Sequence, residues 1–154
     1  MMRVRFDRLS DIVSVKRGDL ISKSDRYKLF TGPDVGNTPQ KGINWLGKAP
    51  DFLHVIVRCA EGSGYSDKWI DVDKDVFLYS LMVKDRGTPS AKINHTAMEN
   101  RALLDQPEHG APILLMIDVE NDNLEVQGRF EVLTALRSNP IHPDIDSVLL
   151  KRIG

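Results

Sequence analysis

Five short apolar runs, separated by clusters of Gly, Pro, Asn and Asp, restrict the fold of this chain more than any other feature of its sequence. They are rich in Val, Ile, Leu and Phe, and they span Phe52–Cys59, Val76–Val83, Ile113–Asp118, Leu124–Leu133 and Val148–Ile153. Short runs of this composition between turn residues are typical of β-strands. The sequence therefore predicts a domain built mainly from β-structure.

The residues between and inside these runs predict how the strands connect. Asn121-Asp122-Asn123 predicts a tight hairpin between the third and fourth runs. Gly128, inside the fourth run, predicts a bulge where the sheet curls. Thr96 followed by Glu99 has the form of a capping box and predicts a helix over Thr96–Asp105, which Pro107 ends. Three long loops are expected over Ser22–Leu46, Asp85–Asn94 and Arg137–Ser147.

Length and composition bound the class of protein. The 154 residues, 41% hydrophobic and 28% charged, predict one folded domain over residues 1–154. No apolar stretch approaches the roughly 20 residues of a membrane span, so we expect a cytoplasmic protein without membrane association. The formal net charge is −1, but the segment from Met1 to Lys28 has more basic than acidic residues. A basic face and ordinary solvated surface charge both fit this distribution.

The motifs of metal, cofactor and catalytic sites are largely missing. Asp71, Asp73 and Asp75 match the first ligand positions of a calcium loop, but Val76 replaces its turn glycine and Met82 its closing carboxylate. The four histidines lack a metal-binding spacing, and no phosphate-binding or hydrolase motif is present. Cys59, the only cysteine, is expected to be a buried thiol at the end of a strand. We therefore expect no metal, no cofactor and no catalytic activity.

An ordered series of short blocks runs through the middle of the chain. The blocks are Lys41-Gly42-Ile43, His54-Val55-Ile56-Val57, Gly64-Tyr65-Ser66-Asp67, Phe77-Leu78-Tyr79-Ser80 and Asn100-Arg101-Ala102-Leu103. Their kinds and order resemble those of the SRA (SET- and RING-associated, or YDG) domain family. Arg17-Gly18-Asp19-Leu20-Ile21, Val126-Gln127-Gly128 and Val148-Leu149-Leu150 extend the resemblance over essentially the whole chain.

The resemblance implies a fold and a function. The expected fold is α+β, with a curled, mostly antiparallel sheet or partly open β-barrel of the PUA-like kind and flanking helices. The expected function is recognition of modified cytosine in double-stranded DNA by base flipping, because a base can be inspected on all sides only outside the stack. The resemblance implies a base-binding pocket formed by Ser63, Gly64, Tyr65, Asp67, Tyr79 and Ser80.

Specific roles follow for these residues. Tyr65 and Tyr79 would stack on the two faces of the base, and Asp67 would accept a hydrogen bond from the exocyclic amine of cytosine. Residues that would enter a groove or contact the DNA backbone are Arg17, Gln40, Lys41, Lys92, Asn94 and His95. Trp45 and Trp69 are either core residues or further pocket walls.

Several alternatives stay open. Where the family has its Tyr-Asp-Gly signature this chain has Val126-Gln127-Gly128, so the mark could be methyl, hydroxymethyl or bulkier, such as a glucosylated cytosine. The parent protein could be a modification-dependent restriction nuclease, which we favour, or a chromatin factor in a nucleus; either would supply a nuclease or effector module. The competing functions are a PUA-like RNA-binding module and a small nuclease or hydrolase that uses Asp67, Asp71, His95 or Glu99.

Overall fold

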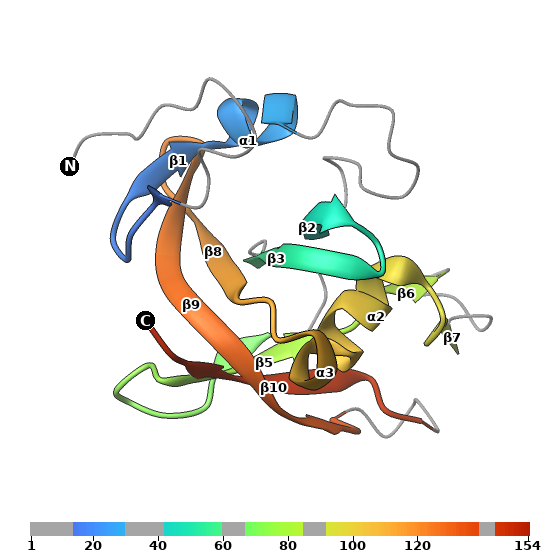
Figure 1. The fold of residues 1–154 in the computed structure, drawn as a ribbon. Coiled ribbons are helices and arrows are strands. Elements are labelled where there is room, and N and C mark those ends of the chain that lie inside the picture. Colours follow the sequence, from blue (N-terminus) through green and yellow to red (C-terminus); the bar gives the residue numbers. More distant parts are fainter. Residues whose placement is uncertain (1–13, 30–41, 60–66, 85–91, 139–143) are drawn as a thin grey trace.

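The computed structural model describes residues 14–29, 42–59, 67–84, 92–138 and 144–154, which form ten strands and three helices (Figure 1). The strands are β1 (Leu20–Ser22), β2 (Ile43–Lys48), β3 (Asp51–Cys59), β4 (Lys68–Trp69), β5 (Val76–Ser80), β6 (Val83–Lys84), β7 (Lys92–Ile93), β8 (Ile113–Val119), β9 (Asn123–Leu136) and β10 (Ser147–Arg152). The helices are α1 (Lys23–Leu29), α2 (Met98–Leu104) and α3 (Gln106–His109).

Eight of these strands form one curled sheet. Its order is β2-β3-β8-β9-β10-β5-β4, with β1 paired to β9. All neighbours are antiparallel except β3 and β8, which run parallel with Val55 opposite Ile113. In Figure 1 the sheet bends so that β3 and β10 lie on either side of α2 and α3. The predicted α+β class, with a curled and mostly antiparallel sheet, is confirmed.

The longest strand, β9, makes the bend. Its first part pairs with β1 and β8, and its last part pairs with β10. Leu115 lies opposite Gly128 whereas Met116 lies opposite Val126, so Gln127 is one extra residue in β9. Gly128 has a φ of 113°, and a Cβ there would lie 2.6 Å from the carbonyl oxygen of Gly154. The predicted bulge at Gly128 is therefore confirmed.

Alternating side chains of the sheet enter two hydrophobic clusters, as the period of two in a β-strand requires. Val55 and Val57 of β3 lie in a large cluster that also contains Ala102 and Leu103 of α2. Ile56, between them in sequence, lies in a second cluster on the other face. Both faces of the central strands are thus buried, which explains why the runs in β3 and β8 are almost continuously apolar.

The strand predictions fail in places where the backbone leaves the sheet. The run Val76–Val83 is not one strand, because β5 ends at Ser80 and β6 begins at Val83. Between them the Leu81 N–H donates to the carbonyl of Asp146 at 2.8 Å, directly beyond the last β5–β10 pair, Ser80–Ser147. The expected loops Ser22–Leu46 and Asp85–Asn94 contain α1, β2 and β7.

The tight hairpin is confirmed, since Asn121 and Asp122 have φ values of 60° and 57° between β8 and β9.

The predicted capping box at Thr96 is wrong. Ala97 precedes α2 and makes no side-chain cap, while the Thr96 hydroxyl donates to Oδ1 of Asn94 at 2.6 Å. Pro107 lies in the first turn of a second short helix, α3, where its missing N–H costs nothing. No helix in the described part of the chain is long and apolar enough to span a membrane.

Candidate functional site

Tyr79 lies near the end of β5, where segments distant in sequence meet. Its side chain is only 4% exposed and belongs to the larger hydrophobic cluster. Its hydroxyl donates to the carbonyl oxygens of Gly42 at 3.2 Å and Arg58 at 3.0 Å. Gly42 immediately precedes β2, and Arg58 is the next-to-last residue of β3. Tyr79 thus fixes two strand ends, and its predicted stacking on a base stays a prediction.

Asp67 is linked to Tyr79 by Ser80, which follows Tyr79 in sequence and is hydrogen-bonded to Asp67. The Ser80 backbone N–H donates to Oδ1 of Asp67 at 2.7 Å. Burial raises the pKa of the Asp67 carboxyl, and hydrogen bonds from the Ser80 backbone, the Ser80 hydroxyl and the Cys59 thiol act in the opposite direction. Cys59, expected to be a buried thiol, is only partly buried. The structure therefore brings together three of the six predicted pocket residues: Asp67, Tyr79 and Ser80.

The other predicted pocket residues, Ser63, Gly64 and Tyr65, lie outside the described residues. Their segment falls between Cys59, at the end of β3, and Asp67. Both of these flanking residues belong to the hydrogen-bonded group around β5. The predicted groove residues Gln40 and Lys41 also lie outside the described residues, directly before Gly42.

The remaining predicted DNA contacts lie in two separate places. Lys92, Asn94 and His95 belong to the segment through β7, whose partner β6 begins three residues after Ser80. Arg17 is exposed in the turn before β1 and acts electrostatically on Arg152. The backbone N–H of Arg152 donates to Asp75, at the start of β5. Arg17 is therefore at the opposite end of β5 from the Asp67–Ser80 pair.

A partly buried polar network, which the sequence did not predict, supports the strands behind Tyr79. Arg58 donates to both carboxylate oxygens of Asp118 at 2.9 and 3.0 Å, and Lys23 of α1 lies 3.2 Å from the same carboxylate. Arg26, 2% exposed, donates to Oδ1 of Asn44. Burial and nearby Arg58 lower the pKa of Arg26 to about 10, against opposing effects of Tyr79 and Asp118.

Both tryptophans pack against other side chains of the core. Trp45 is 4% exposed and makes an edge contact with Phe52 in the larger cluster. Trp69 packs against Phe77 and Phe130, and the guanidinium of Arg152 lies 5.6 Å from its ring centroid. Trp45 is thus a core residue, and Trp69 packs at the edge of that core.

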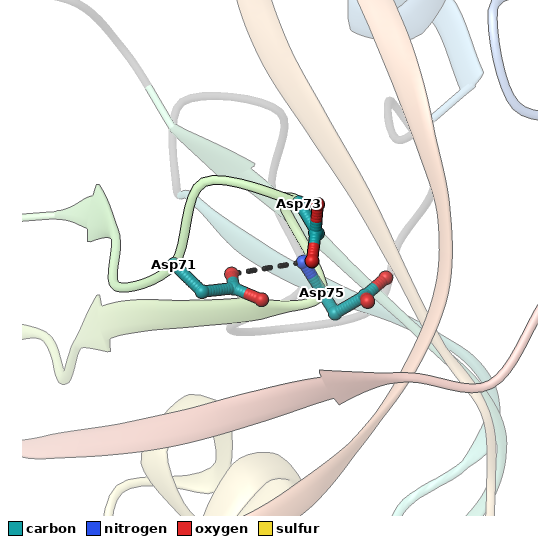
Figure 2. Close-up of side chains that lie close together, drawn as sticks. All are labelled: Asp71, Asp73 and Asp75. Carbon is teal, nitrogen blue, oxygen red and sulfur yellow. Dashed lines mark hydrogen bonds between the residues drawn. The ribbon is translucent and has the colours of Figure 1, made fainter.

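The acidic turn between β4 and β5 brings three carboxylates together (Figure 2). One ligand atom from each of Asp71, Asp73 and Asp75 lies within 4.8 Å of the others. Oδ1 of Asp71 accepts the backbone N–H groups of Asp75 and Val76, both at 3.0 Å, and Asp75 lies 3.4 Å from Nε of Arg152. These bonds form and close the turn. Asp67 and Asp71, which a hydrolase would use together, lie at opposite ends of β5.

The curled sheet defines a class of protein, because its fold is that of the SRA domains. The SRA domain of SUVH5 in complex with hemi-methylated CG DNA is similar with a TM-score of 0.65 and 14% identity, over 99% of this chain and 94% of that chain. SUVH5 SRA bound to fully hydroxymethylated CG DNA has a TM-score of 0.64 and 17% identity, over 91% and 90%.

A domain of a restriction endonuclease is also similar in structure. The DNA recognition domain of the cytosine modification-dependent restriction endonuclease LpnPI is similar with a TM-score of 0.59 and 13% identity, over 97% of this chain and 79% of that chain. No protein-family model and no curated protein matches the sequence. At these identities the structural likeness establishes the SRA-type fold.

Proposed function

We propose that this chain reads modified cytosine in double-stranded DNA and holds the base, flipped out of the duplex, against Tyr79. The observation that carries the proposal is the fixed group at the end of β5, where Ser80 holds the Asp67 carboxylate beside Tyr79. SRA domains with this fold were crystallised with methylated and hydroxymethylated DNA. The similar domain of LpnPI is named as the DNA recognition domain of a modification-dependent restriction endonuclease.

The chemistry of the fixed group suits a cytosine. An ionised carboxylate accepts hydrogen bonds only, which complements the exocyclic N4 amine of cytosine. The Asp67 carboxyl already accepts hydrogen bonds from the Ser80 backbone, the Ser80 hydroxyl and the Cys59 thiol, and it would also receive the amine. The single proton of the Tyr79 hydroxyl is shared between the carbonyl oxygens of Gly42 and Arg58, which fixes the ring, so it needs little ordering when a base stacks on it. Tyr65 would supply the second stacking face.

We propose that the chain recognises the modified base and has no catalytic activity of its own. Its Asp67 is half-buried and bonded to Ser80, and its acidic turn is closed by its own backbone and Arg152. Such a reader would direct another module to modified DNA. We propose a restriction nuclease as that module, on the pattern of LpnPI, with a chromatin factor as the alternative.

The test is a binding panel of duplexes that differ only at one cytosine, which is plain, methylated, hydroxymethylated or glucosylated. We expect tighter binding to at least one modified duplex than to the plain duplex. A fluorescent cytosine analogue at the same site should become brighter as the base leaves the stack. Tight binding with the analogue still stacked would refute base flipping but not modified-base reading.

Two further outcomes would replace the proposal. Preference for single-stranded RNA over every duplex in the panel would indicate a PUA-like RNA-binding module. Cleavage of DNA by the purified chain with Mg²⁺ or Mn²⁺ would indicate a nuclease. A chain that binds all duplexes equally would refute recognition of the modified base.

A further inference from the structure

The hairpin of β6 and β7 is too short to be stable by itself. Within the described residues its strands have two residues each, paired as Val83–Ile93 and Lys84–Lys92. An isolated hairpin is marginal in water even when it is longer. Met82 and Ile93 pack against the larger hydrophobic cluster, but apolar contacts alone do not fix the direction of a strand. Directional bonds must come from outside the hairpin.

One side chain supplies these bonds on both flanks of the hairpin. Asn100 of α2 is 1% exposed, and its Oδ1 accepts the Met82 N–H at 2.8 Å. Its Nδ2 donates to the carbonyl of Met82 at 3.1 Å and to that of Asn94 at 3.0 Å. A single buried amide thus joins the residue before β6 to a residue after β7.

The next residues add weaker support at the same place. Nη1 of Arg101 donates to the carbonyl of His95 at 3.3 Å. The His95 ring nitrogen Nε2 lies 2.7 Å from the carbonyl oxygen of Ile145, so this ring is directed toward the protein. Of the three predicted groove residues on this segment, Lys92 and Asn94 are exposed, whereas His95 is half-buried.

We propose that Asn100 is a positioning residue, which holds the β6–β7 hairpin so that Lys92 and Asn94 face the DNA beside the Asp67–Ser80 pair. Met82 follows Ser80 by two residues, so the bonds of Asn100 fix the hairpin directly after the strand that carries Tyr79. The inference rests on the proposed function for the DNA contact. The mechanical role of Asn100 does not depend on it.

The chain contains a matched control for this role. Gln106 of α3 is 5% exposed, accepts the Val132 N–H at 2.8 Å and donates to the carbonyl of Ala111 at 3.2 Å. It is therefore a second buried amide that bridges backbone groups from a helix, but it has no bond to the hairpin. Asn100→Asp and Gln106→Glu each replace one buried NH₂ donor by an oxygen.

The first measurement is hydrogen exchange of backbone amides in the free chain, under conditions where both variants show native near-ultraviolet circular dichroism. Asn100→Asp should raise the exchange rates of Met82–Lys84 and Lys92–Thr96 by about tenfold, since at least one buried bond is lost. Gln106→Glu should leave these segments at wild-type rates. Unchanged hairpin exchange in Asn100→Asp would overturn the inference. Asn100→Ala and Gln106→Ala repeat the comparison without a buried carboxylate.

The second measurement is a double-mutant cycle on duplex binding. Lys92→Ala should weaken binding to the modified duplex in the wild-type and Gln106→Ala backgrounds by the same factor. In the Asn100→Ala background it should have less effect, because the hairpin no longer presents the lysine. An equal effect in all three backgrounds would overturn the positioning role. A wild-type chain that ignores the modification refutes the proposed function instead, while the exchange result stands independently.

Discussion

Replacement of Tyr79 by Phe is expected to distinguish the contribution of the hydroxyl group from that of the aromatic ring. The hydroxyl donates to the carbonyls of Gly42 and Arg58, and the Gly42 carbonyl also accepts the Arg58 N–H at 2.8 Å. One of the two carbonyls therefore keeps a partner in the variant. A typical buried hydrogen bond contributes about 1 kcal/mol net, so Tyr79→Phe should lower the free energy of unfolding by about 1–2 kcal/mol.

Replacement by Ala removes the ring as well. Deletion of a buried aromatic side chain typically costs about 3–5 kcal/mol, a large part of the stability of an ordinary domain. Tyr79 is 4% exposed and packed in the larger cluster, so Tyr79→Ala belongs in this range. Loss of DNA binding in this variant would therefore report unfolding together with lost stacking. Tyr79→Phe is the better test of function.

In the Phe variant the stacking face survives while the strand ends are held less firmly. We expect the affinity for modified duplex to fall by less than about tenfold, because stacking itself is worth roughly 1–3 kcal/mol per base. Urea denaturation gives the stability, and titration of labelled modified and plain duplexes gives the affinities. Plain duplex serves as the control and should be bound unchanged. A Phe variant as stable as the wild type would refute the argument from the two hydrogen bonds, and a folded Ala variant with full affinity would refute stacking.

Three further predictions concern charged groups. Burial raises the pKa of the Asp67 carboxyl, and only the ionised carboxylate acts purely as an acceptor for the amine. Preference for modified duplex should therefore fall as the pH drops through this raised pKa. The Asp67→Asn variant, compared by the same titrations, should lack that pH dependence. Burial alone would raise the pKa of Asp118, but bonds from Arg58 and Lys23 outweigh it and leave the pKa low. Asp118 therefore stabilises the fold above the ordinary carboxyl pKa, and Asp118→Asn should cost about 1–2 kcal/mol in urea at neutral pH, with a deficit that shrinks in acid. Arg17→Ala should weaken modified and plain duplexes equally and lower the salt dependence of binding by about one unit of slope.

The sequence predicted those parts of the fold that local pattern determines. The apolar runs of β3, β8, β9 and β10 are long enough to be recognised by composition, and Gly128 marks a backbone that only glycine adopts easily. The short strands β1, β4 and β7 have two or three residues each; β1 pairs with the distant β9, and β4 and β7 pair with the neighbouring strands β5 and β6. No local pattern identifies such strands, because their partners and not their composition make them strands.

The capping signals show the same limit at the level of single side chains. Thr96 with Glu99 has the right spacing for a capping box, but Asn94 binds the Thr96 hydroxyl and the helix begins uncapped. Ser22 with Asp25 has a similar spacing, and there the Asp25 N–H does donate to the Ser22 hydroxyl at 3.0 Å, at the start of α1. The two sites differ in where the helix begins. Ser22 directly precedes α1, whereas Ala97 and not Thr96 directly precedes α2, so the Thr96 hydroxyl lies one residue too early to accept the N–H groups of the first turn.

The sequence could predict the candidate site only in part, because contacts with residues distant in sequence also fix it. Tyr79, Ser80 and Asp67 stand in short sequence blocks whose kinds and order resemble those of a known family, but the bonds that fix them come from Gly42, Arg58 and Cys59. Arg58 reaches its Asp118 partner only because β3 runs parallel to β8, a pairing that joins residues 60 positions apart. A parallel pair needs a long connection, and here that connection includes the hairpin, α2 and α3. The topology that holds Tyr79 is therefore also the topology that places Asn100 against the β6–β7 hairpin. One connection of the chain thus fixes both the proposed base-binding group and the proposed DNA-contacting hairpin.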